Sequence, residues 1–207
     1  MKIIGQTILL SCGMFIAAQI SSAQSVNLYF GAGTAMDGSS NTQIDTFGTG
    51  NPFTTPKLTG TFLDIGASAL FTKHVGVGAD MSWRASHGDY AGLLYRPIFY
   101  NFDGIWQPVS SKHFEPELRA GLGGVHIGYS FNQTECDQFA GCSTSNESVE
   151  TSSHFQLHMA AAARLYVTDH VFIRPAVDAH WVNDFFQFGH NWVPEYSMGI
   201  GYSFGGE

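Results

Sequence analysis

The chain has little charge and, after its first residues, no long uninterrupted apolar run. Only 13% of its 207 residues are charged, about half the usual share in a soluble domain. Beyond residue 23 no segment approaches the roughly 18 consecutive apolar residues of a membrane-spanning helix. Yet 44% of the residues are hydrophobic, and there are 24 glycines and 17 phenylalanines. This composition favours apolar residues that alternate with polar ones along strands.

The first residues have the pattern of a secretory signal peptide. A basic start and an apolar run precede three small residues that end at Ala23. We therefore expect a signal peptide at 1–23 and a single mature domain at 24–207. A transmembrane helix is the alternative, but the run is short and lacks a basic flank. A lipoprotein cleavage box before Cys12 is another, although it would leave a very short apolar core.

Cysteine is scarce, and so is positive charge. Beyond the expected signal the cysteines are Cys136 and Cys142, which predict a local disulfide in an oxidising compartment. Two ligands make a poor zinc site, so we expect no metal and no cofactor. Without Lys2 the chain has 17 acidic and 8 basic residues, which argues against nucleic acid as a partner.

Strict alternation is clearest between Val75 and Trp83. The odd-numbered residues are Val75, Val77, Ala79, Met81 and Trp83, whereas the even-numbered ones are glycines, a serine and Asp80. A period of two predicts a strand with one apolar face. An opposite face that carries charge and glycine is typical of a crowded polar lumen.

The same pattern predicts eight strands. They are expected at 25–35, 58–71, 75–83, 94–107, 114–131, 154–167, 171–182 and 193–204. The alternation changes phase within the fifth, and a bulge at Gly123 and Gly124 would restore it. Three connections are short and end in His followed by Val or Phe, at 72–74, 109–113 and 168–170. The other four are longer, at 36–57, 85–93, 132–153 and 183–192.

Short turns alternating with long loops predict an all-β fold, an eight-stranded antiparallel up-and-down transmembrane β-barrel that follows a signal peptide. A soluble lipocalin-like barrel is the alternative, with its apolar residues inside. It is disfavoured because the faces opposite the apolar ones carry too many ionisable groups to bind a lipid.

The last strand carries the sharpest motif. In Ser197–Phe204 a polar residue is followed two positions on by Gly199, and two aromatics, Tyr202 and Phe204, are separated by one residue. The chain resembles the small eight-stranded outer-membrane barrels: the OmpA transmembrane domain, OmpX and the opacity-type proteins. The resemblance implies a bacterial outer-membrane location, lipid as a partner, and recognition of this strand by the barrel-assembly machinery. The tail Gly205–Glu207 departs from the many relatives that end on the aromatic.

Alternation also selects the polar residues that face the lumen. The predicted charge network is Asp64, Asp80, Arg84, Asp103, Glu117, Arg119, Arg164, Arg174 and Asp178. Glu115, His158, His180 and Glu195 are expected on the same side. Opposite charges at similar height in so narrow a barrel should pair and plug it. The alternative is a gate, in which rearranged pairs open a narrow ion path.

We assign no catalytic residue from the sequence. His126 and Ser130 would need Glu115 or Glu117 beside them, and four positions along a strand put the first two about 13 Å apart, too far for proton transfer.

The loop at 183–192 holds four aromatics and predicts an aromatic girdle at the membrane surface, or an exposed apolar patch for a partner. The loop between the cysteines could form a rigid surface knob.

The sequence therefore predicts a non-enzymatic outer-membrane barrel with a structural role, or a surface-interaction role through a ligand of its loops. A narrow gated pore and a lipid-modifying enzyme are the alternatives.

Overall fold

A computed structural model describes residues 24–38, 42–45, 48–90, 92–137 and 141–205. The expected signal peptide and Cys12 lie outside these residues. No helix within the described ranges is long and apolar enough to cross a membrane. The long strands are β1 (Ser25–Ala35), β4 (Phe62–Leu70), β5 (Val75–Arg84), β7 (Leu93–Trp106), β8 (Phe114–Asp137), β9 (Gly141–Tyr166), β10 (Val171–Val182) and β11 (Trp192–Phe204). The short elements are β2 (Gln43–Ile44), β3 (Phe53–Thr54), β6 (Gly88–Tyr90) and the 3-10 turn η1 (Phe186–Phe188).

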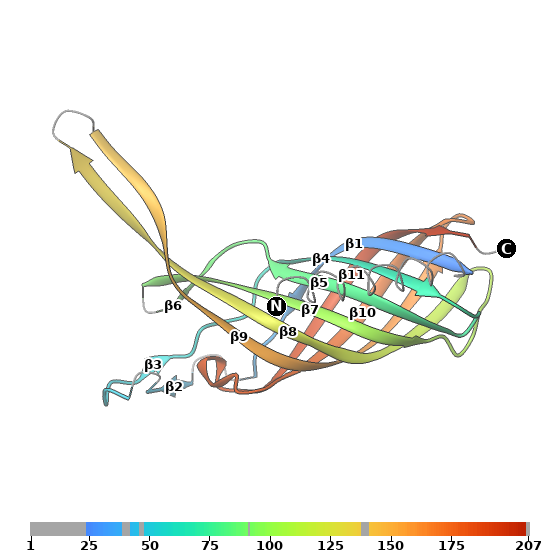
Figure 1. Ribbon diagram of the computed structural model, residues 1–207, viewed down its shortest axis with the longest axis horizontal. Coiled ribbons are helices and arrows are strands. Elements are labelled where there is room, and N and C mark those ends of the chain that lie inside the picture. The colour runs from blue at the N-terminus through green and yellow to red at the C-terminus, as the bar shows by residue number, and fades with distance from the viewer. Residues whose placement is uncertain (1–23, 39–41, 46–47, 91, 138–140, 206–207) are drawn as a thin grey trace, which may run out of the picture.

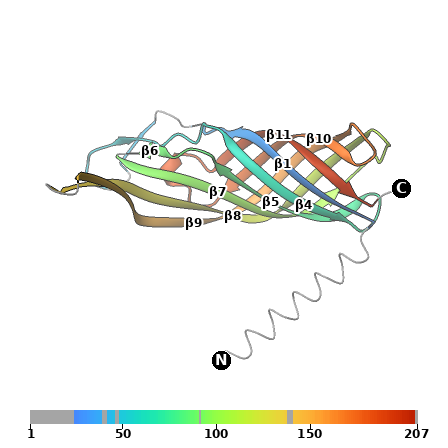
Figure 2. The same cartoon turned by 90° about the horizontal axis from the view of Figure 1, so that it is seen from above.

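The eight long strands form a closed antiparallel barrel. Each pairs with its neighbour along the chain, and β1 pairs with β11. β5 pairs directly with β7, although the short β6 lies between them in the sequence (Figures 1 and 2). Closure leaves the backbone of the barrel without a free sheet edge, which a lipid environment requires. The predicted all-β, up-and-down eight-stranded fold is confirmed.

Two of the strand predictions are too short. β8 and β9 stay paired from Phe114↔Leu165 out to Asp137↔Gly141, so 132–153 is mainly a hairpin and not a loop. Figure 1 shows this hairpin leaving the barrel and bending away from its axis. Its sequence is polar on both faces, so alternation of apolar and polar residues could not reveal it. Its threonines still favour extended backbone.

The predicted bulge at Gly123 and Gly124 is wrong. The β7–β8 and β8–β9 registers run through both glycines without a shift, and the irregularity lies at Tyr129/Ser130. Val125 and Ile127 therefore keep the inward direction of Glu117 and are fully buried. The change of phase in the sequence marks a change in the lumen, from charged to apolar.

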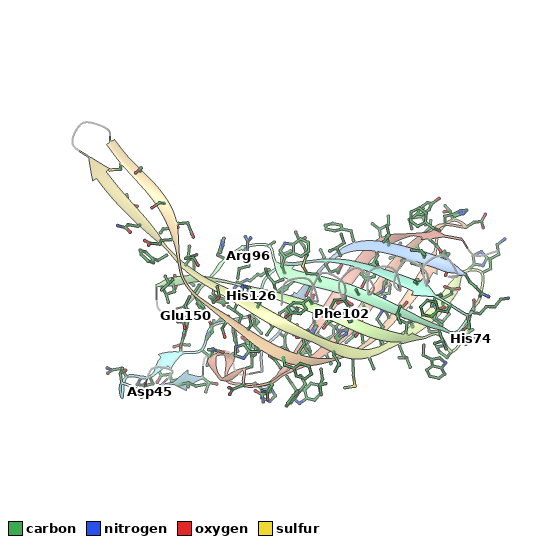
Figure 3. All side chains as sticks on the ribbon, viewed as in Figure 1. Asp45, His74, Arg96, Phe102, His126 and Glu150 are labelled. Atoms are coloured by element: carbon green, nitrogen blue, oxygen red, sulfur yellow. The ribbon has the colours of Figure 1, made fainter. Side chains whose placement is uncertain are left out.

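The outer surface of the barrel is an apolar belt. Phe102 is 68% exposed and Met198 62% exposed, and Figure 3 labels Phe102 midway along the barrel. Further exposed belt residues are Leu28, Phe30, Ile65, Val77, Met81, Tyr100, Trp106, Leu118, Leu122, Phe155, Leu157, Met159, Ile173, Val177, Tyr196, Ile200, Tyr202 and Phe204. Exposing so large an apolar surface to water is unfavourable, and a lipid bilayer would cover it.

The end of the barrel with the short connections, here the short-turn end, has a repeated structure. The hydroxyl of Thr72 accepts a hydrogen bond from the Val75 amide at 3.0 Å, and Thr168 does the same for Val171 at 3.0 Å. The turn histidines reach the adjacent strands: His74 Nδ1 lies 2.8 Å from the Gln107 carbonyl. Two of the three short connections, 72–74 and 168–170, are therefore threonine-capped turns.

Replacing both Thr72 and Thr168 with alanine is expected to lower the free energy of unfolding by about 1–3 kcal/mol, because each change removes a turn hydrogen bond. Denaturant titration in detergent would measure the loss. Serine at both positions keeps the hydroxyl and serves as the control. Equal stability of the alanine and serine variants would contradict this role of the hydroxyl.

Candidate functional site

The lumen nearest the short-turn end is organised around one carboxylate. Glu117 lies 2.6 Å from Arg119 Nε, 3.1 Å from Arg164 Nη2 and 3.1 Å from Arg174 Nη2. These four side chains are at most 4% exposed. Small residues make room for them, since Ala162 is the β9 partner of Glu117 in the sheet register. One acid thus neutralises part of the charge of three buried guanidinium groups.

Further side chains contact the arginines of this cluster. Arg119 lies 3.3 Å from Asp80 and donates to the Tyr29 hydroxyl at 3.2 Å, while the Arg174 guanidinium lies 4.3 Å from the Tyr29 ring centre. Arg164 lies 3.4 Å from Glu115. Strands β1, β5, β8, β9 and β10 are therefore tied together across the lumen.

Halfway along the barrel from the short-turn end, the lumen contains histidine and acidic side chains. His158 lies 2.9 Å from Asp103 through Nδ1 and 3.2 Å from Asp178 through Nε2. The His180 ring stacks on His158 with centroids 4.9 Å apart, and its Nε2 lies 3.5 Å from Glu195. These groups come from β7, β9, β10 and β11, so the middle of the lumen is a polar layer that spans the barrel.

Above this layer the buried side chains form an apolar cluster, here called the apolar plug. Phe185 and Phe188 stack at 4.4 Å between ring centroids, and both are fully buried. The plug consists of Ala35, Leu58, Phe62, Tyr90, Tyr95, Phe99, Val125, Ile127, Tyr129, Val182, Phe185, Phe188 and Val193. The loop at 183–192 was expected to form a surface girdle or an exposed patch, and for these two aromatics that expectation is wrong. They fold into the barrel mouth because it offers an apolar surface to bury.

The structure brings most of the predicted charge network together. Two polar layers, one around Glu117 and one around His158, contain seven of its members: Asp80, Asp103, Glu117, Arg119, Arg164, Arg174 and Asp178. Asp64 faces the same space, although one of its carboxylate oxygens has no hydrogen-bond partner among the described residues. Arg84 lies apart, beside the plug, where it donates to the Lys57 carbonyl and the Tyr95 hydroxyl at 3.2 Å each.

The lumen also contains two uncharged groups, of which sequence reasoning missed Gln156. Asn101 donates to Asp80 at 2.7 Å, and the Gln156 amide donates to Asn101. Alternation places Asn101 on the inward face, and Gln156 lies on the inward phase of its own strand, so the same rule could have identified it. The plug was missed because its loop residues obey no period.

Other candidate groups behave differently. His126 does not approach Ser130; its Nδ1 lies 2.9 Å from the Ser153 hydroxyl on the neighbouring strand. No carboxylate within the described ranges hydrogen-bonds His126, so a catalytic triad is not assembled there. Cys136 and Cys142 face each other in the hairpin register, a placement compatible with the predicted disulfide, which stays a prediction.

Comparison with known proteins agrees with this geometry. Neisserial surface protein A has a TM-score of 0.56 at 14% identity, over 86% of this chain and 97% of that one. Ail, the attachment invasion locus protein of Yersinia pestis, has a TM-score of 0.52 at 12% identity (88% and 99% covered). OprG of Pseudomonas aeruginosa has a TM-score of 0.52 at 14% identity (91% and 99% covered).

The chain has the fold of the small outer-membrane β-barrels. The predicted resemblance is confirmed, and with the apolar belt it supports a location in the bacterial outer membrane. No protein-family model and no curated protein matches the sequence. The likeness is therefore one of fold, and it carries no role over to this chain.

Proposed function

We propose that this barrel is a non-enzymatic surface-interaction protein that contacts its partner through the β8–β9 hairpin. The hairpin supports this because it continues well beyond the barrel. β7 pairs with β8 only from Leu118 to Ser130, and β10 pairs with β9 only from Gln156 to Tyr166. Beyond those residues, within the described ranges, no third strand of the sheet pairs with β8 or β9, and the edge of a two-stranded hairpin is a template for an extended peptide.

The hairpin has a uniform sign of charge. Between Arg119 and Arg164 the sequence contains no Lys or Arg, and the hairpin carries Glu135, Asp137, Glu147 and Glu150. Glu147 and Glu150 are exposed, and Figure 3 shows Glu150 where the hairpin leaves the barrel. Complementary charge steers association, so the partner surface should be basic.

The lumen supports a closed barrel better than a pore. The buried ion pairs around Glu117 fill one end, and the apolar plug fills the other. Eight strands enclose space for side chains and little else. We also propose that Gly199, Tyr202 and Phe204 of the terminal strand form the signal for the barrel-assembly machinery. The aromatics are exposed on the outer face, and their strand completes the barrel by pairing with β1.

Shortening the hairpin tests the proposal. A variant in which residues 132–149 are replaced by Asn-Gly keeps every strand pair of the barrel and should still show heat-modifiable gel migration. In nanodiscs, wild type should bind a polylysine-coated surface and the shortened variant should lose that binding. Binding should weaken at about 1 M salt, where the Debye length is about 3 Å.

A second variant serves as the matched control. Glu147→Gln/Glu150→Gln keeps the hairpin but removes two charges, and it should reduce binding without abolishing the fold. If the shortened variant binds as well as wild type, the hairpin is not the contact surface. Unchanged lipid profiles of cells with and without the protein are expected from the non-enzymatic part of the proposal.

A further inference from the structure

Three side chains in the middle of the lumen are arranged as metal ligands. Asp80 on β5, Asp103 on β7 and His158 on β9 each offer one ligand atom, and these atoms all lie within 4.8 Å of one another. Asp103 and His158 are fully buried as side chains, and Asp80 is 13% exposed. We propose that Asp80, Asp103 and His158 form a binding site for one divalent transition-metal ion.

The sheet register explains how three distant residues converge. Gly121 on β8 pairs with Asp103 on one side and with His158 on the other. A Cβ at Gly121 would lie 2.4 Å from the Asp103 carboxylate. Glycine at this point therefore leaves the space across β8 in which the carboxylate and the imidazole meet.

The surrounding groups orient the ligands as in metalloprotein sites. With Nδ1 of His158 directed at Asp103, its Nε2 lies 3.2 Å from Asp178, so the second ring nitrogen can donate to a carboxylate. Asp80 Oδ2 accepts from Asn101 at 2.7 Å and Oδ1 accepts from Arg119 at 3.3 Å, so a bound ion would share this carboxylate with the guanidinium group. Such outer partners fix ring orientation and raise ligand basicity. His180, with neither ring nitrogen in a hydrogen bond within the described residues, stacks on His158 and places a second imidazole beside the first.

The charge of the lumen favours a bound cation. The inward carboxylates of the two polar layers are Asp64, Asp80, Asp103, Glu115, Glu117, Asp178 and Glu195. The arginines that face them are Arg119, Arg164 and Arg174. Buried negative charge in excess of positive charge is costly. Most of that excess lies in the polar layer that contains His158 and His180. A divalent ion would reduce it at the place where it is concentrated.

The donor set selects the class of ion. One imidazole and two carboxylates suit Zn²⁺, Mn²⁺, Co²⁺ or Fe²⁺, whereas Mg²⁺ and Ca²⁺ prefer oxygen ligands alone. A cavity of about 990 Å³ opens at the short-turn end and reaches Glu115 and Tyr166. An ion can also enter while the barrel folds, so the experiment supplies metal both to the folded protein and during refolding.

Co²⁺ is the direct probe. Wild-type barrel in detergent, stripped with chelator and refolded with Co²⁺, should gain visible d–d absorption at one equivalent, and Zn²⁺ should displace it. His158→Gln and Asp103→Asn should lose the signal, and Asp178→Asn should weaken affinity by about 10–100-fold. His154→Gln, on the same strand but outside the cluster, should bind as wild type does.

Asp80→Asn provides a variant that keeps the histidine and its two hydrogen-bonded carboxylates. It should fold, show heat-modifiable migration, and bind Co²⁺ more weakly. Absence of Co²⁺ absorption from folded wild type after both routes of metal addition overturns the proposal. In that case His158 acts as an imidazolium that bridges Asp103 and Asp178. Signal that survives in both His158→Gln and Asp103→Asn would also overturn it.

Discussion

Replacing Glu117 with glutamine is expected to lower the free energy of unfolding by about 3–5 kcal/mol, the usual cost of removing one partner from a buried ion pair. Three arginines converge on this carboxylate at 2.6, 3.1 and 3.1 Å. An amide of the same size keeps the packing but removes the negative charge. The three guanidinium groups would then repel one another in a space from which water is largely excluded.

Denaturant titration of the folded barrel in detergent would measure this loss. Glu147→Gln is the matched control, because Glu147 lies exposed on the hairpin and no ion pair within the described residues depends on it. It should leave stability unchanged within about 0.5 kcal/mol. Equal stability of Glu117→Gln and wild type would mean that the arginines are neutralised by other groups.

The fold was predictable because the barrel imposes a strict period on the sequence. Lipid outside and polar groups inside force alternation, and β1 and β10 have the bounds that alternation predicts. Most of the charge network followed from the same rule, since a residue's phase determines its face. Pairing partners did not follow, because contacts such as Arg174 with Glu117 join strands that are not adjacent.

The errors have a physical cause as well. Alternation marks the boundary between lipid and lumen, and it carries no information where both faces of a strand meet water, as in the β8–β9 hairpin. The prediction that apolar strand residues face lipid is wrong for Val125 and Ile127, because this lumen has an apolar end. Arg84 was grouped with the network on phase alone, although its height along the strand places it beside the plug.

The apolar plug leads to the second large expected effect. Replacing both Phe185 and Phe188 with alanine should lower the free energy of unfolding by more than about 5 kcal/mol, since each buried phenylalanine contributes about 3–5 kcal/mol. Both rings are fully buried, they stack on each other, and Phe188 packs edge-on against Tyr95 at 5.8 Å. Their loss would empty the mouth of the barrel of its central packing.

The same titration measures this loss, and Trp192→Ala is the control, because that aromatic closes the same loop but is 43% exposed. It should cost far less. In planar bilayers the wild type should not conduct, and the double variant should still conduct little, because the ion pairs around Glu117 remain below the plug. A double variant as stable as wild type would show that the two rings do not pack in the lumen. Steady conductance of the wild type would instead show that the apolar plug and the ion pairs around Glu117 together do not close the lumen.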